Sequence, residues 1–342
     1  MRLKLPVSRA RMVTNVDLGR MIAVGAAGCG RFGRTVMRLN GRQALIAAIA
    51  LTFVSSAVAS ARIVVPPLLP LNTGGGTTPI KGDFNSVTVT NEWGHISVVA
   101  GTTSSIKEKT SYNLAGPVLS QSIKNGVLTI SVACQGAEPI TAGVSVDGVV
   151  DVVNDCVDDL VVTVPGSISL LAKTQLGDIK TSGINGDQAL KAAQGNVTVQ
   201  DSTSRNLTVA VSHGNISVAG LIASVATAHT DYGYVDVANS AIGTLDALTN
   251  EGGVSVRDCS IPTLAATGTR GPVDVTEVIS PSSIAAKTTK GSVTIAVPKG
   301  SYNVDAHTPN AVLIGGGITL DSTSPYSVKA GTDDGNIAVS GT

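Results

Sequence analysis

Two carboxylates, Asp236 and Asp274, are the strongest candidates for catalysis in this sequence. Each stands three residues after a glycine in a recurring Gly-x-Val/Ile-x-Val/Ile pattern. If successive copies stack as strands, the two backbones lie about 9–10 Å apart, close to the carboxyl separation of inverting glycosidases. Ser255 occupies the same place in the intervening copy, and no Tyr, Trp or Arg shares the third place. We therefore expect two solvated carboxylates and no catalytic residues.

An acidic cluster offers the oxygen ligands that Ca²⁺ prefers. It comprises Asp151, Asp155, Asp158 and Asp159. Its spacing matches no known calcium-binding loop, so a solvated acidic loop is the favoured interpretation. The chain's four histidines, by contrast, stand at unrelated repeat positions and include no His-x-x-x-His pair; they are His95, His213, His229 and His307. Zinc sites need such ligand sets, so we expect no metal site and no cofactor.

Two cysteines, Cys134 and Cys156, flank most of this acidic segment. In an oxidising compartment they are the natural candidates for a disulfide. Cys259 stands in a loop between two repeats, and we expect it to be unpaired and partly buried.

A leader of about 61 residues precedes the rest of the chain. Residues 44–59, ALIAAIALTFVSSAVA, are uncharged, follow Arg38 and Arg42, and end in small residues. This is the layout of a secretory signal, with cleavage expected after Ala59 or Ala61. Met37 begins a signal of ordinary length and is the favoured true start. The alternatives are a long basic region and an uncleaved anchor, although 16 apolar residues are short for a membrane span of about 20.

A repeat of about 19 residues dominates the second half of the chain. Its leading glycines stand at positions 177, 195, 214, 233, 252, 271 and 291, with further copies of the motif at 94 and 335. Each glycine follows a Leu-x-Ala-x-Thr segment, although we expect the segments before Gly195 and Gly233 to slip by one residue. Both halves of the unit alternate with period two, which predicts two short strands per repeat joined at a glycine corner. The sequence therefore predicts an all-β chain, a single-stranded parallel β-solenoid with coils of about 19 residues.

The remaining segments complete the domain plan. Residues 62–82 are rich in Pro and Gly and are expected to be a linker, and residues 83–342 form the solenoid domain. Residues 101–166 carry no copies of the repeat, but Asn125-Gly126 lies between two alternating runs, which is a strong hairpin signal. We interpret 101–166 as an N-terminal antiparallel hairpin with an Asp-rich insertion that caps the stack.

Charge and composition exclude some functions. Nine of the 24 basic residues and one of the 24 acidic residues lie in residues 1–59, so the rest carries 15 basic and 23 acidic residues, a net charge of −8. Nucleic-acid binding needs a basic surface, so nucleic acid is not an expected partner. After residue 59 the sequence has no apolar run of 18 residues, so no membrane span is expected in the mature chain.

The repeat unit, the Asn-Gly hairpin, the segment LVVTVPG at 160–166 and the closing copies at 291–300 and 328–341 resemble the bacterial putative-adhesin family of β-strand-repeat proteins. The resemblance covers about residues 83–342. It implies a β-solenoid and an envelope or surface setting. That family has no assigned biochemical activity, so the resemblance supplies no catalytic or binding residues.

These features together predict an exported, non-enzymatic β-solenoid that acts as an adhesin or as an interaction module of a bacterial surface or envelope. The expected compartment is the periplasm, the outer surface or the medium, and the expected partner is an unidentified surface protein or glycan. Two alternatives remain: a polysaccharide hydrolase or lyase on the same scaffold, and a structural or regulatory envelope protein.

The signal predicts where the mature protein begins. When the chain is expressed with its native upstream sequence, the exported form is expected to start at Ser60 or Arg62, because signal peptidase cuts after small residues. Amino-terminal sequencing of the exported form checks this. An exported form that begins before Ala44 would contradict it.

Overall fold

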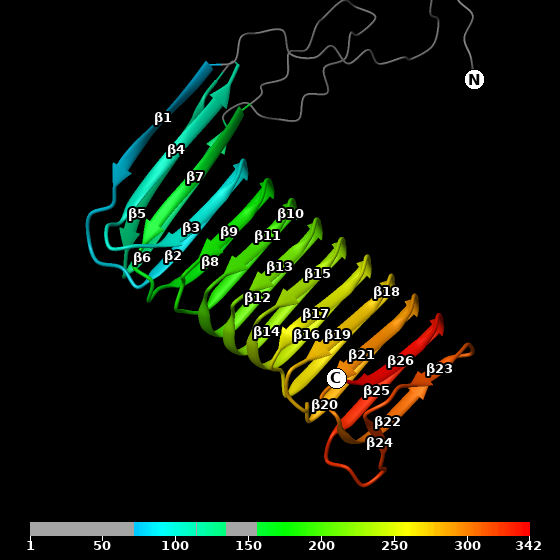
Figure 1. Ribbon diagram of the computed structural model, residues 1–342. Helices are drawn as coiled ribbons and strands as arrows, with labels where there is room; N and C mark the ends of the chain where they lie inside the picture. The colour runs from blue at the N-terminus through cyan, green and yellow to red at the C-terminus, as the bar shows by residue number, and fades with distance from the viewer. Residues whose placement is uncertain (1–71, 114, 135–155) are drawn as a thin grey trace, which may run out of the picture. The chain divides into compact units, whose positions relative to one another are not determined.

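The structure, a computed structural model, describes residues 72–113, 115–134 and 156–342 (Figure 1). The leader, residues 62–71 of the expected linker, and Asp151 and Asp155 of the acidic cluster lie outside the described residues. Within those ranges the chain forms 26 strands in two sheets of 13 strands each. No helix in the described part of the chain is long and apolar enough to cross a membrane.

We call the two sheets A and B. The strands of sheet A, in spatial order, are β1 (Asn72–Pro79), β4 (Ser105–Tyr112), β7 (Cys156–Val164), β3 (Ile96–Ala100), β9 (Ile179–Ser182), β11 (Val197–Gln200), β13 (Ile216–Ala219), β15 (Val235–Ala238), β17 (Val254–Cys259), β19 (Val273–Glu277), β21 (Val293–Val297), β26 (Ile337–Gly341) and β23 (Val312–Ile314). Those of sheet B are β24 (Ile318–Leu320), β22 (Gly300–His307), β25 (Ser327–Asp334), β20 (Ser283–Lys290), β18 (Thr263–Arg270), β16 (Ala241–Glu251), β14 (Ile222–Tyr232), β12 (Thr203–His213), β10 (Gln188–Gln194), β8 (Ser169–Leu176), β2 (Ser86–Trp93), β6 (Val127–Cys134) and β5 (Pro117–Lys124).

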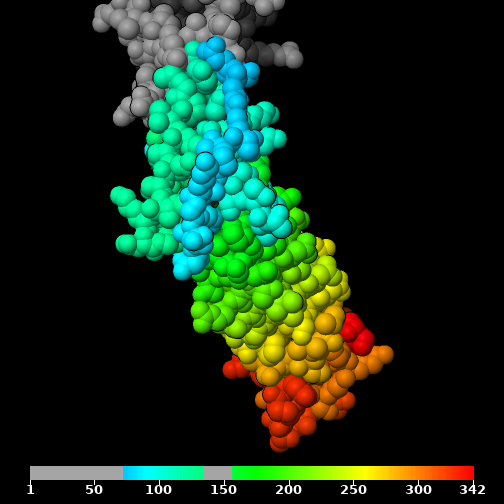
Figure 2. Space-filling view, turned by 90° about the vertical axis from the view of Figure 1, so that its left-hand side faces the viewer, coloured from blue at the N-terminus to red at the C-terminus, as the bar shows by residue number. Residues whose placement is uncertain are grey.

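Each repeat is one coil, which gives one strand to sheet B and the next to sheet A. From β8 to β21 the coils follow one another in chain order, as the continuous change of colour in Figure 2 shows. Val254 pairs in parallel register with Val235 on one side and Val273 on the other, and all three are buried. The core therefore consists of Val, Ile, Leu and Ala columns between the sheets, which confirms the predicted β-solenoid and its inward positions.

The corner glycines explain why the repeat needs glycine. Gly252 has φ +142° and Gly271 has φ +135°, a region that side chains with a Cβ rarely adopt. A Cβ on Gly252 would also collide with the carbonyl oxygen of Gly233, and one on Gly271 would collide with that of Gly252. Conformation and close approach thus both require glycine at this corner.

The threonine of the repeat has a matching function. The buried hydroxyl of Thr249 donates a hydrogen bond of 2.8 Å to the carbonyl oxygen of Gly233, one coil back. Thr230, Thr288 and Thr332 make the same bond to the glycine of the preceding coil, at 2.8, 2.9 and 2.8 Å. Because the chain leaves sheet B at this corner, the side chain supplies the donor that the backbone ladder would otherwise provide.

The segments before Gly195 and Gly233 keep the register, so the expected one-residue slip is wrong. Gln188 stands opposite Leu170 and Leu207, and Ala226 stands opposite Leu207 and Leu245. Two continuous backbone ladders fix these positions, and they hold even where the side chain is a poor match. Gln188 is only 2% exposed, and its amide finds no hydrogen-bond partner among the described residues.

The predicted N-terminal hairpin is present. Strands β5 and β6 pair antiparallel around Asn125 and Gly126, whose φ values of 52° and 75° are typical of a type I′ turn. Strand β4 runs antiparallel to β7, and both lie outside the coil formed by β2 and β3. Residues 101–166 therefore extend the N-terminal end of both sheets.

Two parts of this region differ from the sequence analysis. Of the expected linker, Asn72–Pro79 forms strand β1, which pairs with β4 along its whole length. The free edge of β4 offers backbone partners, and a chain of Gly and Thr can follow it without side-chain packing. Cys156–Val164, which overlaps the expected Asp-rich loop, is strand β7, because alternate residues from Cys156 to Val164 are buried.

The threonine–glycine bond can be tested by substitution. Thr249→Val leaves the carbonyl of Gly233 without its donor in a buried site and is expected to lower the free energy of unfolding by about 1–3 kcal/mol. Thr208→Val, the same change at an exposed position of β12, should cost less than about 0.5 kcal/mol. Urea unfolding of both variants measures the difference, and equal losses would show that the buried hydroxyl has no special function.

Candidate functional site

Asp236 and Asp274 share the column predicted for them, with Ser255 between them. They lie on the outward face of sheet A, and Asp236 holds both carboxylate oxygens 2.7 and 2.8 Å from Nη2 of Arg257. The sequence analysis found no arginine in this column and missed Arg257, which reaches Asp236 diagonally from the next coil. A carboxylate engaged by arginine on an open face is a surface ion pair and is poorly suited to acid–base catalysis.

The histidines are separate from one another. His95, His229 and His307 each lie beside a different aspartate, at 3.5, 3.7 and 2.7 Å, and His213 stacks on Tyr232 with ring centroids 4.8 Å apart. Among the described residues no group of three His, Cys, Asp or Glu side chains could hold a metal ion.

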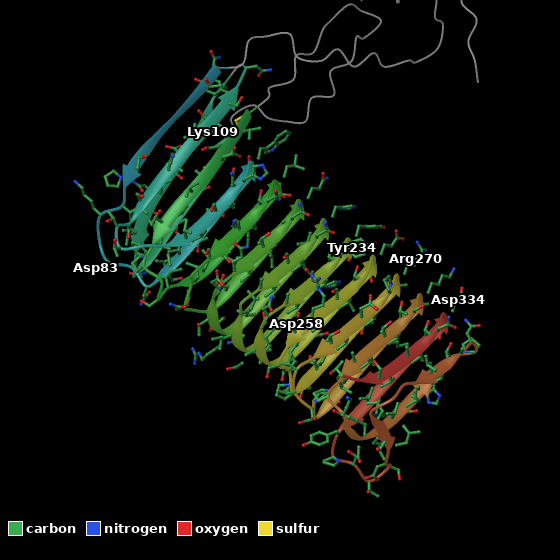
Figure 3. All side chains as sticks on the ribbon, in the orientation of Figure 1. Asp83, Lys109, Tyr234, Asp258, Arg270 and Asp334 are labelled. Atoms are coloured by element: carbon green, nitrogen blue, oxygen red, sulfur yellow. A yellow bond between two sulfur atoms is a disulfide. The ribbon has the colours of Figure 1, made fainter. Side chains whose placement is uncertain are left out.

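The residues that follow the corner glycines form a ladder that the sequence analysis missed. The backbone N–H of Asn196 donates to Oδ1 of Asp178, and that of Asn215 donates to Oδ1 of Asn196, at 2.7 and 2.9 Å. Tyr234 N–H donates in turn to Oδ1 of Asn215 at 2.8 Å. Figure 3 shows Tyr234, Arg270 and Asp334 along this edge of the stack. These polar side chains hold the corners together, so their presence does not indicate a binding site.

The acidic cluster is divided by strand β7. Asp158 is fully buried, and its carboxylate has no hydrogen-bond partner among the described residues, whereas Oδ1 of Asp159 accepts the N–H of His95 at 3.1 Å. Burial, followed by the charges of Glu108 and Asp159, raises the pKa of Asp158 to about 7. Since neighbouring residues of a strand face opposite sides, these two aspartates cannot share one calcium ion.

The three cysteines of the described chain are buried. The structure joins Cys134, at the end of β6, to Cys156, at the start of β7, with their Cα atoms 5.9 Å apart, an ordinary disulfide separation. The bridge thus links sheet B to sheet A at the N-terminal end. Cys259 is free, and burial raises its thiol pKa to about 11, so it remains protonated at neutral pH.

The clearest hollow lies at the corner opposite the glycines, where sheet B strands begin. It has a volume of about 590 Å³. Strands β12 and β14 start four residues before the positions that match the start of β10, because Gln188 pairs with Leu207. The first residues of the long strands line one side of the hollow, and the turns at 167–169 and 185–187 line the other. A step in strand length therefore creates this groove.

The groove is polar. Its hydroxyl and amide side chains are Asn85, Ser167, Ser169, Asn185, Thr203, Ser204 and Ser224. Asp187 and Arg205 are its charged residues, and Ile222, 59% exposed, is its main exposed apolar side chain. The lining contains no His or Cys and one carboxylate, so it can bind a polar ligand but lacks paired acid and base groups.

The sequence analysis named no residue of this groove. Its one signal was the change of glycine spacing from 18 residues, between Gly177 and Gly195, to 19 thereafter. That change marks the coil where the strands lengthen.

Known proteins share this architecture. A family model described as Toastrack DUF4097 matches residues 84–340. Solved structures similar to the chain include putative adhesins from Parabacteroides distasonis (16% identity, TM-score 0.48, 78% of this chain and 97% of the other) and Bacteroides fragilis (14%, 0.41, 79% and 97%). A third, a putative lipid binding protein from Parabacteroides distasonis, has 12% identity and a TM-score of 0.47 over 77% of this chain and 96% of its own. No curated protein matches the sequence.

Glu277 predicts how stability depends on pH. Its side chain is 1% exposed, Oε2 accepts the N–H of Ile261 at 3.0 Å, and burial raises its pKa to about 8. The folded state therefore keeps this proton while the unfolded state loses it, so folding becomes less favourable as pH rises from about 5 to 8. Glu277→Gln should remove this loss, and its stability advantage over the wild type should grow across that range.

Thermal unfolding at pH 5, 6.5 and 8 measures the effect. Glu92→Gln, an exposed change in β2, is the control and should follow the wild type at each pH. A constant difference between Glu277→Gln and the wild type would contradict the prediction.

The bridge between Cys134 and Cys156 closes a loop with a sequence separation of 22 residues. We expect linked peptides in non-reducing mass mapping, and a loss of about 3 kcal/mol at the N-terminal end on reduction, from chain entropy. Hydrogen exchange should locate that loss in β4 to β7, because coils contact only their neighbours. Two free thiols in protein isolated from an oxidising compartment would contradict the prediction.

Proposed function

This chain belongs to the Toastrack DUF4097 family, and we propose that it is an exported, non-enzymatic binding module that acts in the manner of an adhesin. The observation that carries the proposal is a polar groove of about 590 Å³, built on a rigid stack of paired strands and lined by a single carboxylate. A site of this kind can select a ligand by hydrogen bonds. It lacks the second group that proton transfer requires.

Export is part of the proposal. It is supported by the signal-like segment at 44–59 and by the pair Cys134 and Cys156, because disulfides persist in oxidising compartments. The proposed setting is a bacterial envelope or surface, and the proposed partner is a glycan or a surface protein. Long sheets with regularly spaced side chains suit this setting, since they hold a binding site in a fixed geometry without moving parts.

The proposal predicts binding without turnover. Exported protein incubated with common polysaccharides and surface proteins should retain a ligand on a binding array and release no new reducing ends. Replacing both Asp236 and Asp274 with Asn should leave folding and ligand retention unchanged, because both lie on the open face of sheet A. A sugar-cleaving activity that disappears in this double variant would replace the proposal with an enzymatic function. Absence of retention for every ligand would favour a structural role.

A further inference from the structure

The groove beside β12 is built around one carboxylate that is already occupied. Asp187 accepts the backbone N–H of Asn206 at 3.0 Å and its side-chain amide at 3.3 Å. These bonds, with the neighbouring Arg205, keep the pKa of Asp187 below its ordinary value. Because β10 begins opposite Leu207, it leaves this part of the edge of β12 unpaired, and Asp187 takes its place. Asp187 is therefore a structural residue of the groove.

Arg205 is left free by this arrangement. Its Nη2 atom lies 3.8 Å from Oδ2 of Asp187, at the outer limit of an ion pair, and its side chain is 85% exposed. Its guanidinium presents a planar fork of N–H donors that matches the two oxygens of a carboxylate. Compare Arg257, which spends Nη2 on both oxygens of Asp236. Arg205 lines a hollow with its donors available.

The other groups in the groove suit the hydroxyls of a sugar. Amides of Asn85 and Asn185 can both donate and accept hydrogen bonds, as can the hydroxyls of Ser169, Thr203 and Ser224. Ile222 adds an exposed aliphatic surface beside them. A saccharide ring offers hydroxyls on its rim and C–H groups on its face, so it can use both kinds of surface.

A peptide is less well matched to this groove. Extended peptides bind sheets by pairing with free backbone groups, but the backbone donors here are used between coils. Thr203 N–H donates to Ile184 O at 3.0 Å, Ser169 N–H to Asn85 O at 3.0 Å, and Ile222 N–H to Ser202 O at 2.9 Å. Recognition must therefore come from side chains, which favours a ligand rich in hydroxyl groups.

We propose that this groove binds an acidic saccharide, with Arg205 holding a sugar carboxylate and the surrounding amides and hydroxyls holding the ring hydroxyls. The inference rests on the proposed function, since it names the ligand class for the same binding module. It assigns Arg205 as the residue that determines specificity for the acidic sugar.

Calorimetric titration of the exported protein tests the assignment. The probes are hexagalacturonate, which carries a carboxylate on every ring, neutral maltohexaose, and hexaglutamate as an acidic peptide. Hexagalacturonate should bind, and the other two should bind at least tenfold more weakly. Arg205→Gln should weaken hexagalacturonate binding by about tenfold or more, the range for a hydrogen bond to a charged group. Arg205→Lys, which keeps the charge and loses the fork, should fall between Arg205→Gln and the wild type.

Lys287→Gln is the matched control. It removes one positive charge from an exposed position of β20 on the same sheet, outside the groove, and should change affinity less than twofold. Equal unfolding midpoints for the variants and the wild type would confirm that folding is intact, as expected for so exposed a side chain as Arg205.

Three outcomes would overturn the inference. They are an absence of hexagalacturonate binding, binding that Arg205→Gln leaves unchanged, and binding of hexaglutamate as tight as that of the sugar. None of these removes the proposed function while another glycan or surface protein is still retained on the array. Loss of all retention, in contrast, would remove the proposed function and this inference together.

Discussion

The close approach of backbone at the glycine corner constrains the rest of this molecule. Each corner glycine passes so near the carbonyl of the glycine one coil back that no Cβ fits between them. That contact sets the distance between coils and keeps successive coils in register. Once it is fixed, Val235, Val254 and Val273 must stack inward, and the alternating positions must face water. The columns of the core follow from a single repeated backbone geometry.

A consequence of this geometry is that side chains must complete the hydrogen bonding at the corners. Thr249 supplies a donor to the carbonyl of Gly233 from inside, and Asn215 supplies an acceptor to the N–H of Tyr234 from outside. At the opposite corner, Asp187 does the same for Asn206. Much of the polar character of the repeat is therefore structural. The groove beside Arg205 is distinguished by polar groups that this internal bonding leaves available.

The repeat made the fold predictable, and the departures from it made the site unpredictable. Alternation around Gly177 to Gly291 was enough to predict two strands per coil, the inward columns and the Asn125-Gly126 hairpin. It could not show that Gln188 keeps register, because a buried polar side chain contradicts the apolar pattern and only the neighbouring ladders hold it there. Nor could it reveal the groove, which depends on where strands begin in space. Strand β1 was missed since its Gly-rich segment pairs through backbone alone.

The order of strands at the two ends sets the sequence of events when the chain folds. Strand β2 lies between β6 and β8, so the first coil gains its inner neighbour only after residue 169 has been made, and Thr174 reaches back 80 residues to Gly94. At the other end β25 enters between β20 and β22, although β22 precedes it in the chain. Pairing across such distances is slow compared with pairing of adjacent coils. The middle coils can therefore form first, and both ends close last, so a chain that emerges amino-terminus first must wait for its later coils before its opening strands are secured.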